Sequence, residues 1–524
     1  MRRAARDHFS QRPDAGSRTR NTPGCGATTG HAYTSPAARR LDLAASVLRR
    51  AENGYGAWLD HIWPAAACTH PIRLHGLIRH VDPATGEILR TASTDAMPDR
   101  VIYKPCGNRR DRACPGCAET YRRDAFQLIR AGLAGGKGIP ATVAAHPAVF
   151  ATFTAPSFGP VHARPVRLHA CADLAHCRCK PEPCHARRDT PVCSHGRPMV
   201  CWRRHSPGDA RLGQPLCPHC YDYAAHAVWN NAAGELWRRT KQDIERHLTA
   251  LAGRRGLSPV RLSHGKAAEY QARGAVHFHV LLRLDGIDLA DPARITPPPA
   301  GITAADLEGA IRRTVRVISY RTPPHPASPA GWVIGWGTEL DIRVIRMRGI
   351  GTVTDLAVAS YLAKYSTKGT EPAGHASARI TPDTIGLYAH ADGTHPERLI
   401  HACWTLGAAP DYVGLRRWAH MLGFGGHFLT KARRYSVTLT ALRQARITYR
   451  RHQDAGLEHG PIESRDDAGT TLVLNWLTFT GTGWHTTADA LLANTAADQA
   501  RKRRQAGRDE LTTEYASSTA SEAA

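Results

Sequence analysis

The chain has 524 residues, too many for one ordinary hydrophobic core, so two or three domains are expected. Its 69 lysines and arginines outnumber 45 acidic residues and give a formal net charge of +24, which favours a polyanionic partner, nucleic acid before an anionic membrane surface. No run of about 18 apolar residues is present, and the Arg-rich start Met1–Arg6 lacks the apolar core of a secretory signal. We therefore expect a cytoplasmic protein without a membrane segment.

Residues 1–60 are rich in Arg, Ala, Gly, Ser and Thr and hold few large apolar side chains before Leu41. Such a composition cannot bury a core. It predicts a disordered basic arm that ends in a short helix near residues 41–52.

The cysteines of residues 61–140 are the first chemical signal. Fourteen cysteines in a basic, unsecreted chain more often bind metal than form disulfides. Cys106, Cys114 and Cys117 follow a C-x7-C-x2-C pattern, and a C-x-x-C turn directs two thiolates at one tetrahedral Zn²⁺. The alternative is a set of buried free thiols. The candidates for the fourth ligand are Cys68, which we prefer, His70 and His75.

A β-branched and aromatic run, 148–156, predicts a strand within residues 141–166, stopped by Pro156. The segment that follows, 167–227, is a second cysteine-rich module. The four cysteines expected to bind zinc there are Cys193, Cys201, Cys217 and Cys220. A more irregular set either holds another zinc or belongs to a variable insertion: Cys171, Cys177, Cys179 and Cys184, with His169, His176 and His185 among them.

Residues 228–400 should form the main domain. Its first element is an amphipathic helix at 229–253 with a basic outer face. A hairpin at 262–285 follows, and then a Pro-rich insertion, 286–330, which holds a helix near 304–319. The alternating residues of 337–346 predict a half-buried strand.

The hairpin carries a possible metal site. His277 and His279 are two residues apart, so on a strand their side chains leave the same face. Gly274 is a turn residue, and the piece before it can fold back and bring Glu269 close to both imidazoles. Two histidines and one carboxylate make an open divalent-metal site. The competing interpretation is a polar pair on a solvated strand face.

A tyrosine-bearing helix follows, with capping-box spacing at 352–355 and an expected end at Gly369. Four of its side chains have the spacing i, i+3, i+4 and i+7 of one helix face: Tyr361, Lys364, Tyr365 and Lys368. Alone, they also fit half-buried tyrosines and solvated lysines. Beside a metal, a phenol could attack a phosphodiester, and the lysines could favour the phenolate and hold the phosphate.

Residues 401–486 are helical and basic with a short strand at 471–480, and residues 487–524 are expected to be mostly disordered. No P-loop motif occurs in the chain, so unwinding of a duplex would need a host helicase.

The motifs together resemble those of the HUH endonucleases, and most closely the replication initiators of actinomycete plasmids and integrative elements. The resemblance covers about residues 68–440. It rests on six segments: Cys106–Arg110, Phe150–Pro156, Cys217–Tyr223, Glu269–His279, Tyr361–Lys368 and Leu422–His427.

The resemblance implies an α+β fold, in which a five-stranded antiparallel HUH-type sheet is flanked by helices and the zinc modules are inserted before the catalytic strands. It puts the histidine pair on a central strand with the tyrosine helix across it. Related initiators have a Glu where Tyr361 stands, which implies Tyr365 as the first nucleophile and Tyr361 as a second. Several relatives use another third metal ligand, so Gln271 rivals Glu269.

The activity implied is nicking and joining of single-stranded origin DNA through a 5′-phosphotyrosine, with Mg²⁺ or Mn²⁺ at the active site and structural Zn²⁺ elsewhere. It would start rolling-circle replication of a mobile element in the bacterial cytoplasm, with duplex and single-stranded origin DNA and a host helicase and polymerase as partners. The alternatives are an HUH transposase or relaxase and a non-catalytic zinc-dependent DNA-binding regulator.

Overall fold

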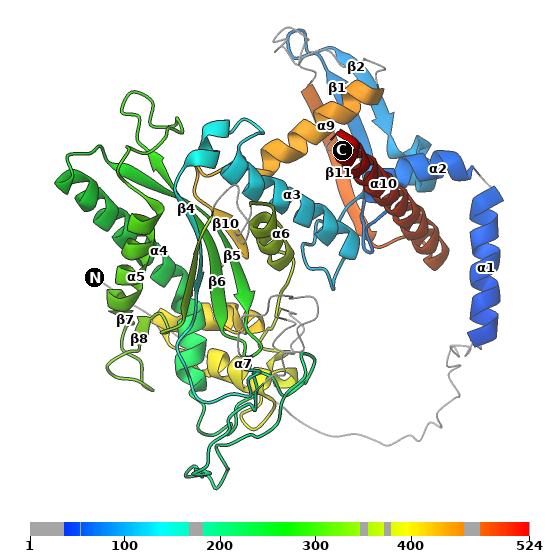
Figure 1. Ribbon diagram of the computed structural model, residues 1–524. Coiled ribbons are helices and arrows are strands. Elements are labelled where there is room, and N and C mark those ends of the chain that lie inside the picture. Colours follow the sequence, from blue (N-terminus) through cyan, green and yellow to red (C-terminus); the bar gives the residue numbers. More distant parts are fainter. Residues whose placement is uncertain are drawn as a thin grey trace, which may run out of the picture.

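The computed structural model describes residues 36–52, 54–166, 182–345, 355–370, 379–454 and 472–522. They form two larger antiparallel sheets and a two-stranded hairpin, with helices packed around them (Figure 1). No helix in these ranges is both long enough and apolar enough to cross a bilayer.

The larger sheet has five strands in the order β10-β5-β6-β4-β9, and every neighbouring pair is antiparallel. β6 is the central strand, as expected for the strand of the histidine pair. The strands are β10 (Leu429–Lys431), β5 (Val260–Tyr270), β6 (Val276–Gly286), β4 (Ala148–Phe153) and β9 (Leu340–Val344).

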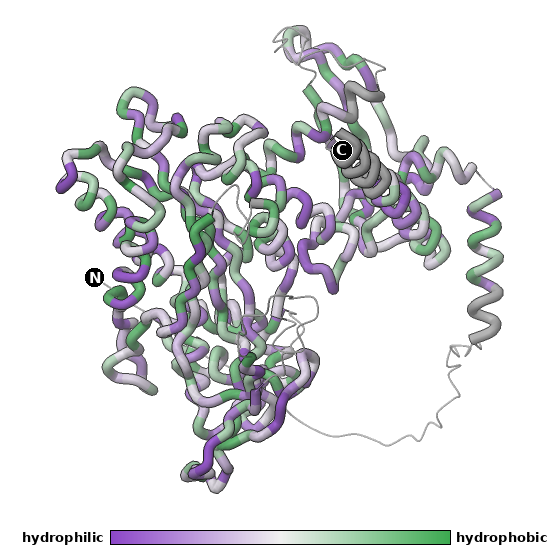
Figure 2. The backbone as a smooth tube through the Cα atoms, in the orientation of Figure 1, coloured by the Kyte–Doolittle hydropathy of each residue, from purple (hydrophilic) through white to green (hydrophobic). Residues whose placement is uncertain are grey.

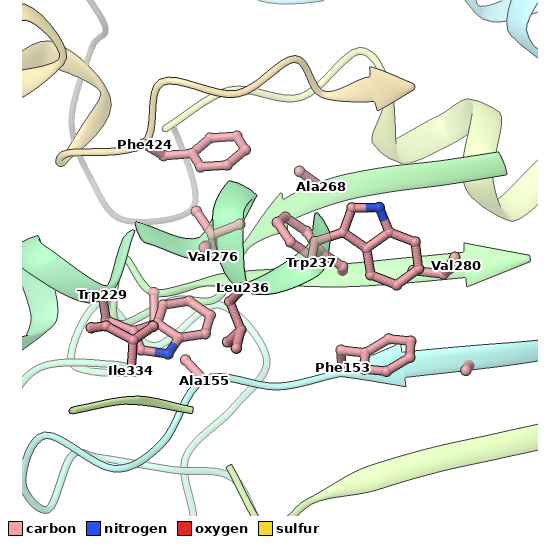
Figure 3. Close-up of a cluster of buried hydrophobic side chains, with 14 of the residues drawn as sticks. Phe153, Ala155, Trp229, Leu236, Trp237, Ala268, Val276, Val280, Ile334 and Phe424 are labelled. Atoms are coloured by element: carbon pink, nitrogen blue, oxygen red, sulfur yellow. The ribbon is translucent and has the colours of Figure 1, made fainter. Parts of the chain in front are cut away.

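One face of this sheet packs on a large aromatic core. Side chains alternate along a strand, so Phe278 and Val280 of β6 point away from the histidines. Phe278 meets Trp237 of the first helix of this layer edge-on, and Val280 belongs to the same buried cluster as Trp237 (Figure 3). Buried strands carry hydrophobic residues along much of their length, as the hydropathy colouring shows (Figure 2). The helices of this layer are α4 (Tyr223–Arg254), α5 (Ala304–Val317), α7 (His395–Leu406) and α8 (Val413–Arg417), with the hairpin β7 (Ser319–Arg321) and β8 (Val333–Gly335) beside them.

The opposite face, which bears the histidines, is covered by α3 (Pro115–Ala134) and α6 (Asp355–Tyr365), while α9 (Leu439–Asp454) contacts α3. Val358 and Leu362 of α6 are fully buried against this face, as their positions in the sequence suggested. The tyrosine helix therefore lies across the sheet on its histidine side.

The smaller sheet joins the two ends of the chain. Its order is β11-β1-β2, and β3 pairs with β1, all antiparallel. Trp58, Tyr103 and Trp484 form its core, and Arg50 bridges Asp99 and Asp489 at 2.7 and 2.8 Å. The elements are β1 (Ile72–Val81), β2 (Ile88–Ser93), β3 (Ile102–Lys104), β11 (Leu472–Thr482), α1 (Pro36–Glu52), α2 (Tyr55–Ile62) and α10 (Thr487–Glu522).

The structure differs from the predicted domain boundaries at both chain ends. The short helix expected near residues 41–52 is present as part of α1, but the arm continues into a second helix, α2. Residues 61–140 contain three strands and α3 rather than loops, and most of the expected disordered tail 487–524 is α10. The physical reason is mutual burial: α1 and α10 contact each other, and α10 buries Ala493 beside Trp484. The contact between α1 and α10 joins segments about 450 residues apart, so no local sequence pattern indicates it.

The packing of α3 on the sheet gives a stability prediction. A Cβ at Gly132 of α3 would overlap the ring of Tyr435, which is fully buried, whereas a Cβ at Gly234 of α4 meets no atom within 4 Å. We expect Gly132→Ala to destabilise the protein by about 1–3 kcal/mol through overpacking. Gly234→Ala should be neutral or stabilise it by roughly 0.5–1 kcal/mol through helix propensity. Thermal unfolding of the two variants provides the check, and equal melting temperatures would contradict this account of the α3 interface.

Candidate active site and metal centres

The register of β5 against β6 assembles a cluster of two imidazoles and a carboxylate, called here the metal triad. Glu269 pairs directly with His277, and His279 follows on the same face opposite Ala267. One carboxylate oxygen, Oε2 of Glu269, lies 3.2 Å from His277 Nε2 and 3.1 Å from His279 Nε2. The three ligand atoms lie within 4.8 Å of one another, as a shared ion requires.

The charge states of the triad suit a divalent cation. Burial alone would raise the pKa of Glu269, but its contacts with His277, His279 and Lys368 outweigh this and lower the pKa to about 2. Burial lowers the pKa of His279. An ionised carboxylate and a neutral imidazole are the forms that coordinate metal. Two imidazole nitrogens and a carboxylate oxygen could together hold a divalent metal ion.

Gln271, the rival third ligand, is engaged elsewhere. Its Oε1 accepts a hydrogen bond from Arg273 Nε at 2.9 Å, beyond the end of β5. The structure therefore brings Glu269, not Gln271, to the histidine pair.

The tyrosine helix α6 brings both phenols to the triad. The Tyr361 hydroxyl lies 3.5 Å from His279 Nε2, and the Tyr365 ring centroid lies 5.4 Å from that of His279. The two tyrosine rings are 4.5 Å apart. Lys368 Nζ donates to Glu269 Oε1 at 3.0 Å and sits 4.1 Å from the centre of the Tyr365 ring.

Lys364 does not share this position. It is exposed and makes no described contact with the triad or the tyrosines. At 3.6 residues per turn, i+3 and i+4 fall on opposite sides of residue i, so Lys364 points away from the side on which Tyr365 lies. The helix ends at Tyr365 rather than at Gly369 as expected, and Lys368 is placed by the turn that follows. Of the four side chains predicted to act together, the structure brings together Tyr361, Tyr365 and Lys368.

Strand β4 supports the site with two side chains that sequence reasoning missed. Thr152 pairs in register with His279, and its Oγ1 lies 3.1 Å from His279 Nδ1. A hydrogen bond to the far nitrogen of a metal-binding histidine sets its tautomer and ring orientation. Phe150 stacks parallel to the His279 ring at 6.0 Å and meets Tyr361 edge-on at 5.8 Å. Phe150 and Thr152 are two residues apart and therefore lie on one face of β4. This spacing is the sequence signal from which their place beside the site could have been predicted.

Arg109 holds the end of the tyrosine helix. Its Nη1 donates to the carbonyl oxygens of Ser366 and Lys368 at 2.9 and 2.6 Å, and its guanidinium lies 3.9 Å from the centre of the Phe428 ring. The N–H of Asp111 donates to Thr367 O at 3.2 Å. α6 ends at Tyr365, so these carbonyls belong to the turn that follows the helix. The loop of Arg109 and Asp111 holds this turn and thereby the position of Lys368.

The same loop begins at a four-cysteine cluster. The sulfurs of Cys68 and Cys114 are 3.8 Å apart, and those of Cys106 and Cys117 are 3.7 Å apart. Tetrahedral Zn–S bonds of about 2.3 Å put two sulfurs about 3.8 Å from each other. All four ligand atoms lie within 4.8 Å, which makes Cys68 the fourth member. The alternatives face elsewhere, His70 toward Thr69 and His75 toward Asp95.

The second cysteine cluster differs from the predicted one by one ligand. Cys193, Cys217 and Cys220 are together, but their fourth partner is His195, whose Nδ1 lies 3.2 Å from Cys220 Sγ. Cys201 is not part of it. A tight turn closed by Gly196 N to Cys193 O folds His195 back, and the chain then carries Cys201 away to pair with His185. Cys184 lies near Cys201, while Cys171, Cys177 and Cys179 fall outside the described residues.

The metal triad makes a binding prediction. Glu269→Gln and His277→Ala should each weaken Mn²⁺ binding to the full-length protein. Loss of a residue that only supports a metal ligand lowers metal affinity roughly 10–100-fold, so loss of a ligand itself should cost at least as much. Gln271→Ala, a change in the rival ligand, should leave the affinity unchanged. Titration calorimetry or Mn²⁺ paramagnetic resonance measures the affinity. If only Gln271→Ala weakened binding, Gln271 rather than Glu269 would be the third ligand.

Arg109 makes a dynamic prediction. In Arg109→Gln the turn after α6 loses the donor shared by Ser366 O and Lys368 O, so backbone amides of residues 362–370 should exchange with solvent faster. Arg112→Gln, at an exposed position on the same loop, is the matched control. Hydrogen exchange read by mass spectrometry tests this, and unchanged protection in Arg109→Gln would show that the rest of the fold holds the helix end.

Comparison with known proteins agrees with the motifs. Residues 54–498 match the family model described as "Replication initiator protein, pSAM2". A curated protein of Streptomyces ambofaciens, "Replication initiator protein", is 42% identical over 465 residues, which is 87% of this chain and 92% of that protein. No solved structure matches the chain. The chain belongs to the actinomycete plasmid replication initiator family.

Proposed function

We propose that the chain initiates rolling-circle replication of its element by cutting and rejoining one DNA strand at the origin through a phosphotyrosine. The observation that carries the proposal is the meeting of the metal triad with two tyrosines and Lys368 at one point on the sheet, from elements about ninety residues apart in sequence. A structural role alone does not require a phenol beside a carboxylate and two imidazoles.

In the proposed reaction a tyrosine oxygen attacks the phosphorus of one phosphodiester. A bond from that oxygen to phosphorus forms while the bond from phosphorus to the 3′ oxygen breaks. The proton lost by the phenol is balanced by the one gained by the departing 3′ hydroxyl, which is then free to prime a polymerase. Rejoining runs the same exchange backwards, with a 3′ hydroxyl attacking the phosphotyrosine.

Each residue has a distinct task in this scheme. A divalent cation held by Glu269, His277 and His279 would neutralise the non-bridging oxygens of the phosphate. Lys368 is within reach of both Glu269 and the Tyr365 ring, so its ammonium can pair with the phosphate or favour the phenolate. Thr152 keeps the His279 ring in its orientation.

We assign the first attack to Tyr365 and the second to Tyr361. Burial, with further contributions from Tyr365 and Glu269, raises the pKa of Tyr361. Its phenolate is therefore disfavoured, whereas the ring of Tyr365 has a cation 4.1 Å away. The hydroxyl of Tyr361 nevertheless lies beside His279, where it could attack once charges at the site have changed.

The DNA partner fits the charge of the chain. A formal charge of +24 would attract single-stranded and duplex origin DNA without reading its sequence. Unwinding by a host helicase and extension by a host polymerase complete the proposed cycle.

The two tyrosines give the decisive test. On a single-stranded origin oligonucleotide with Mn²⁺, wild type should form a covalent protein–DNA adduct that maps to the peptide carrying Tyr365. Tyr365→Phe should lose this adduct to background because its ring has no oxygen to attack phosphorus. Tyr361→Phe should retain the first cleavage but lose the second transfer, which is read with a pre-nicked substrate.

Tyr449→Phe, at an exposed position on α9 far from the triad in sequence, is the control and should cleave like wild type. If wild type binds the oligonucleotide but forms no adduct, the nicking mechanism fails and a DNA-binding regulator remains. An adduct mapping to Tyr361 would reverse the assigned order.

A further inference from the structure

We propose that His162, Cys184, Cys201 and His205 hold a structural zinc ion, separate from the two cysteine clusters described above. Their ligand atoms all lie within 4.8 Å of one another. Cys184 Sγ is 3.7 Å from His162 Nδ1, and Cys201 Sγ is 3.6 Å from His205 Nε2. Tetrahedral bonds of about 2.3 Å to sulfur and about 2.0–2.1 Å to nitrogen put the two atoms about 3.5 Å apart. The spacing is therefore that of ligands around one ion.

Three of the four proposed zinc ligands are buried, so water has little access to their donor atoms. His205, Cys184 and Cys201 are 1%, 6% and 9% exposed, and both cysteines are free rather than joined in a disulfide. The N–H of Ala163 donates to Cys184 Sγ at 3.2 Å, the kind of contact that stabilises a thiolate. Two sulfurs and two imidazoles converging in a buried space form the donor set of a Cys₂His₂ zinc site.

An outer carboxylate orients one of the histidines. His205 Nδ1 lies 2.7 Å from Asp209 Oδ2, and Asp209 is itself held by the backbone N–H of Arg211 at 3.0 Å and by its guanidinium at 3.2 Å. With its proton on Nδ1, His205 presents a bare Nε2 to the cluster. A carboxylate behind a histidine is the usual arrangement around protein-bound zinc.

The ion would join three parts of the inserted segment that the fold places next to the hairpin of the metal triad. Val161 pairs with Pro215, His185 pairs with Cys201, and Gly213 at φ +83° packs so closely on Ala272 that a Cβ there would collide with its backbone. Ala272 lies in the β5–β6 turn. The proposed zinc site would thereby hold the segment that supports this turn.

Zinc counting on the full-length protein tests the proposal. After dialysis against a weak chelator to remove loosely bound ions, plasma mass spectrometry gives zinc per chain. Cys201→Ser and His205→Asn should each bind one zinc fewer than wild type. Cys403→Ser is the matched control, since Cys403 is also a buried free cysteine but lies in α7, outside the metal-ligand clusters found among the described residues, and it should keep the wild-type count. An unchanged count in both Cys201→Ser and His205→Asn would overturn the site.

A second measurement covers variants that fail to fold. Asp209→Asn leaves all four ligands in place, so it should keep the zinc count but release one equivalent to a competing chelator about 10–100-fold more readily. Release at the wild-type rate would contradict the role given to the carboxylate. Neither readout depends on DNA cleavage, so this site and the proposed function can fail separately.

Discussion

The candidate active site depends on one register, the pairing of β5 with β6. A shift of a single residue would turn His277 and His279 toward the aromatic core under α4 and leave Glu269 without partners, because side chains alternate along a strand. The turn is fixed from two sides. Asn230 of α4 donates to Gly274 O at 3.0 Å and accepts from Val276 N at 3.0 Å, and Arg273 donates to the carbonyls of Ala155 and Pro156. The metal triad is thus held by a helix and by the segment after β4, which contribute none of its ligands.

The tyrosine half of the site has a separate support. The end of α6 is held by the loop that starts at Cys106, through Arg109, while the β5–β6 turn rests on the inserted segment with Cys184 and Cys201. Both supports are loops without a large hydrophobic core, and bound zinc is a means by which such loops become rigid. Under the proposals above, the cysteine-rich segments would position the nucleophile and the metal ligands relative to each other, in addition to any contact with DNA.

Local patterns predicted the pieces of the site and not its tertiary partners. The H-x-H spacing, the turn at Gly274 and the buried Val358 and Leu362 all follow from strand and helix periodicity, and the structure has them where expected. Arg109 could not be identified because its role arises from a contact with residues more than 250 positions away. The exchange of His195 for Cys201 has a local cause instead: the tight turn from Cys193 to Gly196, which the cysteine spacing did not indicate, brings His195 back to the cluster. The smaller sheet was not predicted because its paired strands β1 and β11 are about four hundred residues apart in the sequence.

The two tyrosines stand one helical turn apart over the same imidazole, yet their surroundings are unequal. Tyr361 is packed edge-on against Phe150 and His279 and has the raised pKa, while Tyr365 lies under the ammonium of Lys368. Lys368 in turn is tied to Glu269, so any cation that binds the triad competes with Lys368 for that carboxylate. Metal binding would therefore free the ammonium for the Tyr365 oxygen or the phosphate. Under the proposed mechanism, such a site would favour a fixed order of attack over interchangeable nucleophiles, because in the described contacts Lys368 is shared between Glu269 and Tyr365 and not Tyr361.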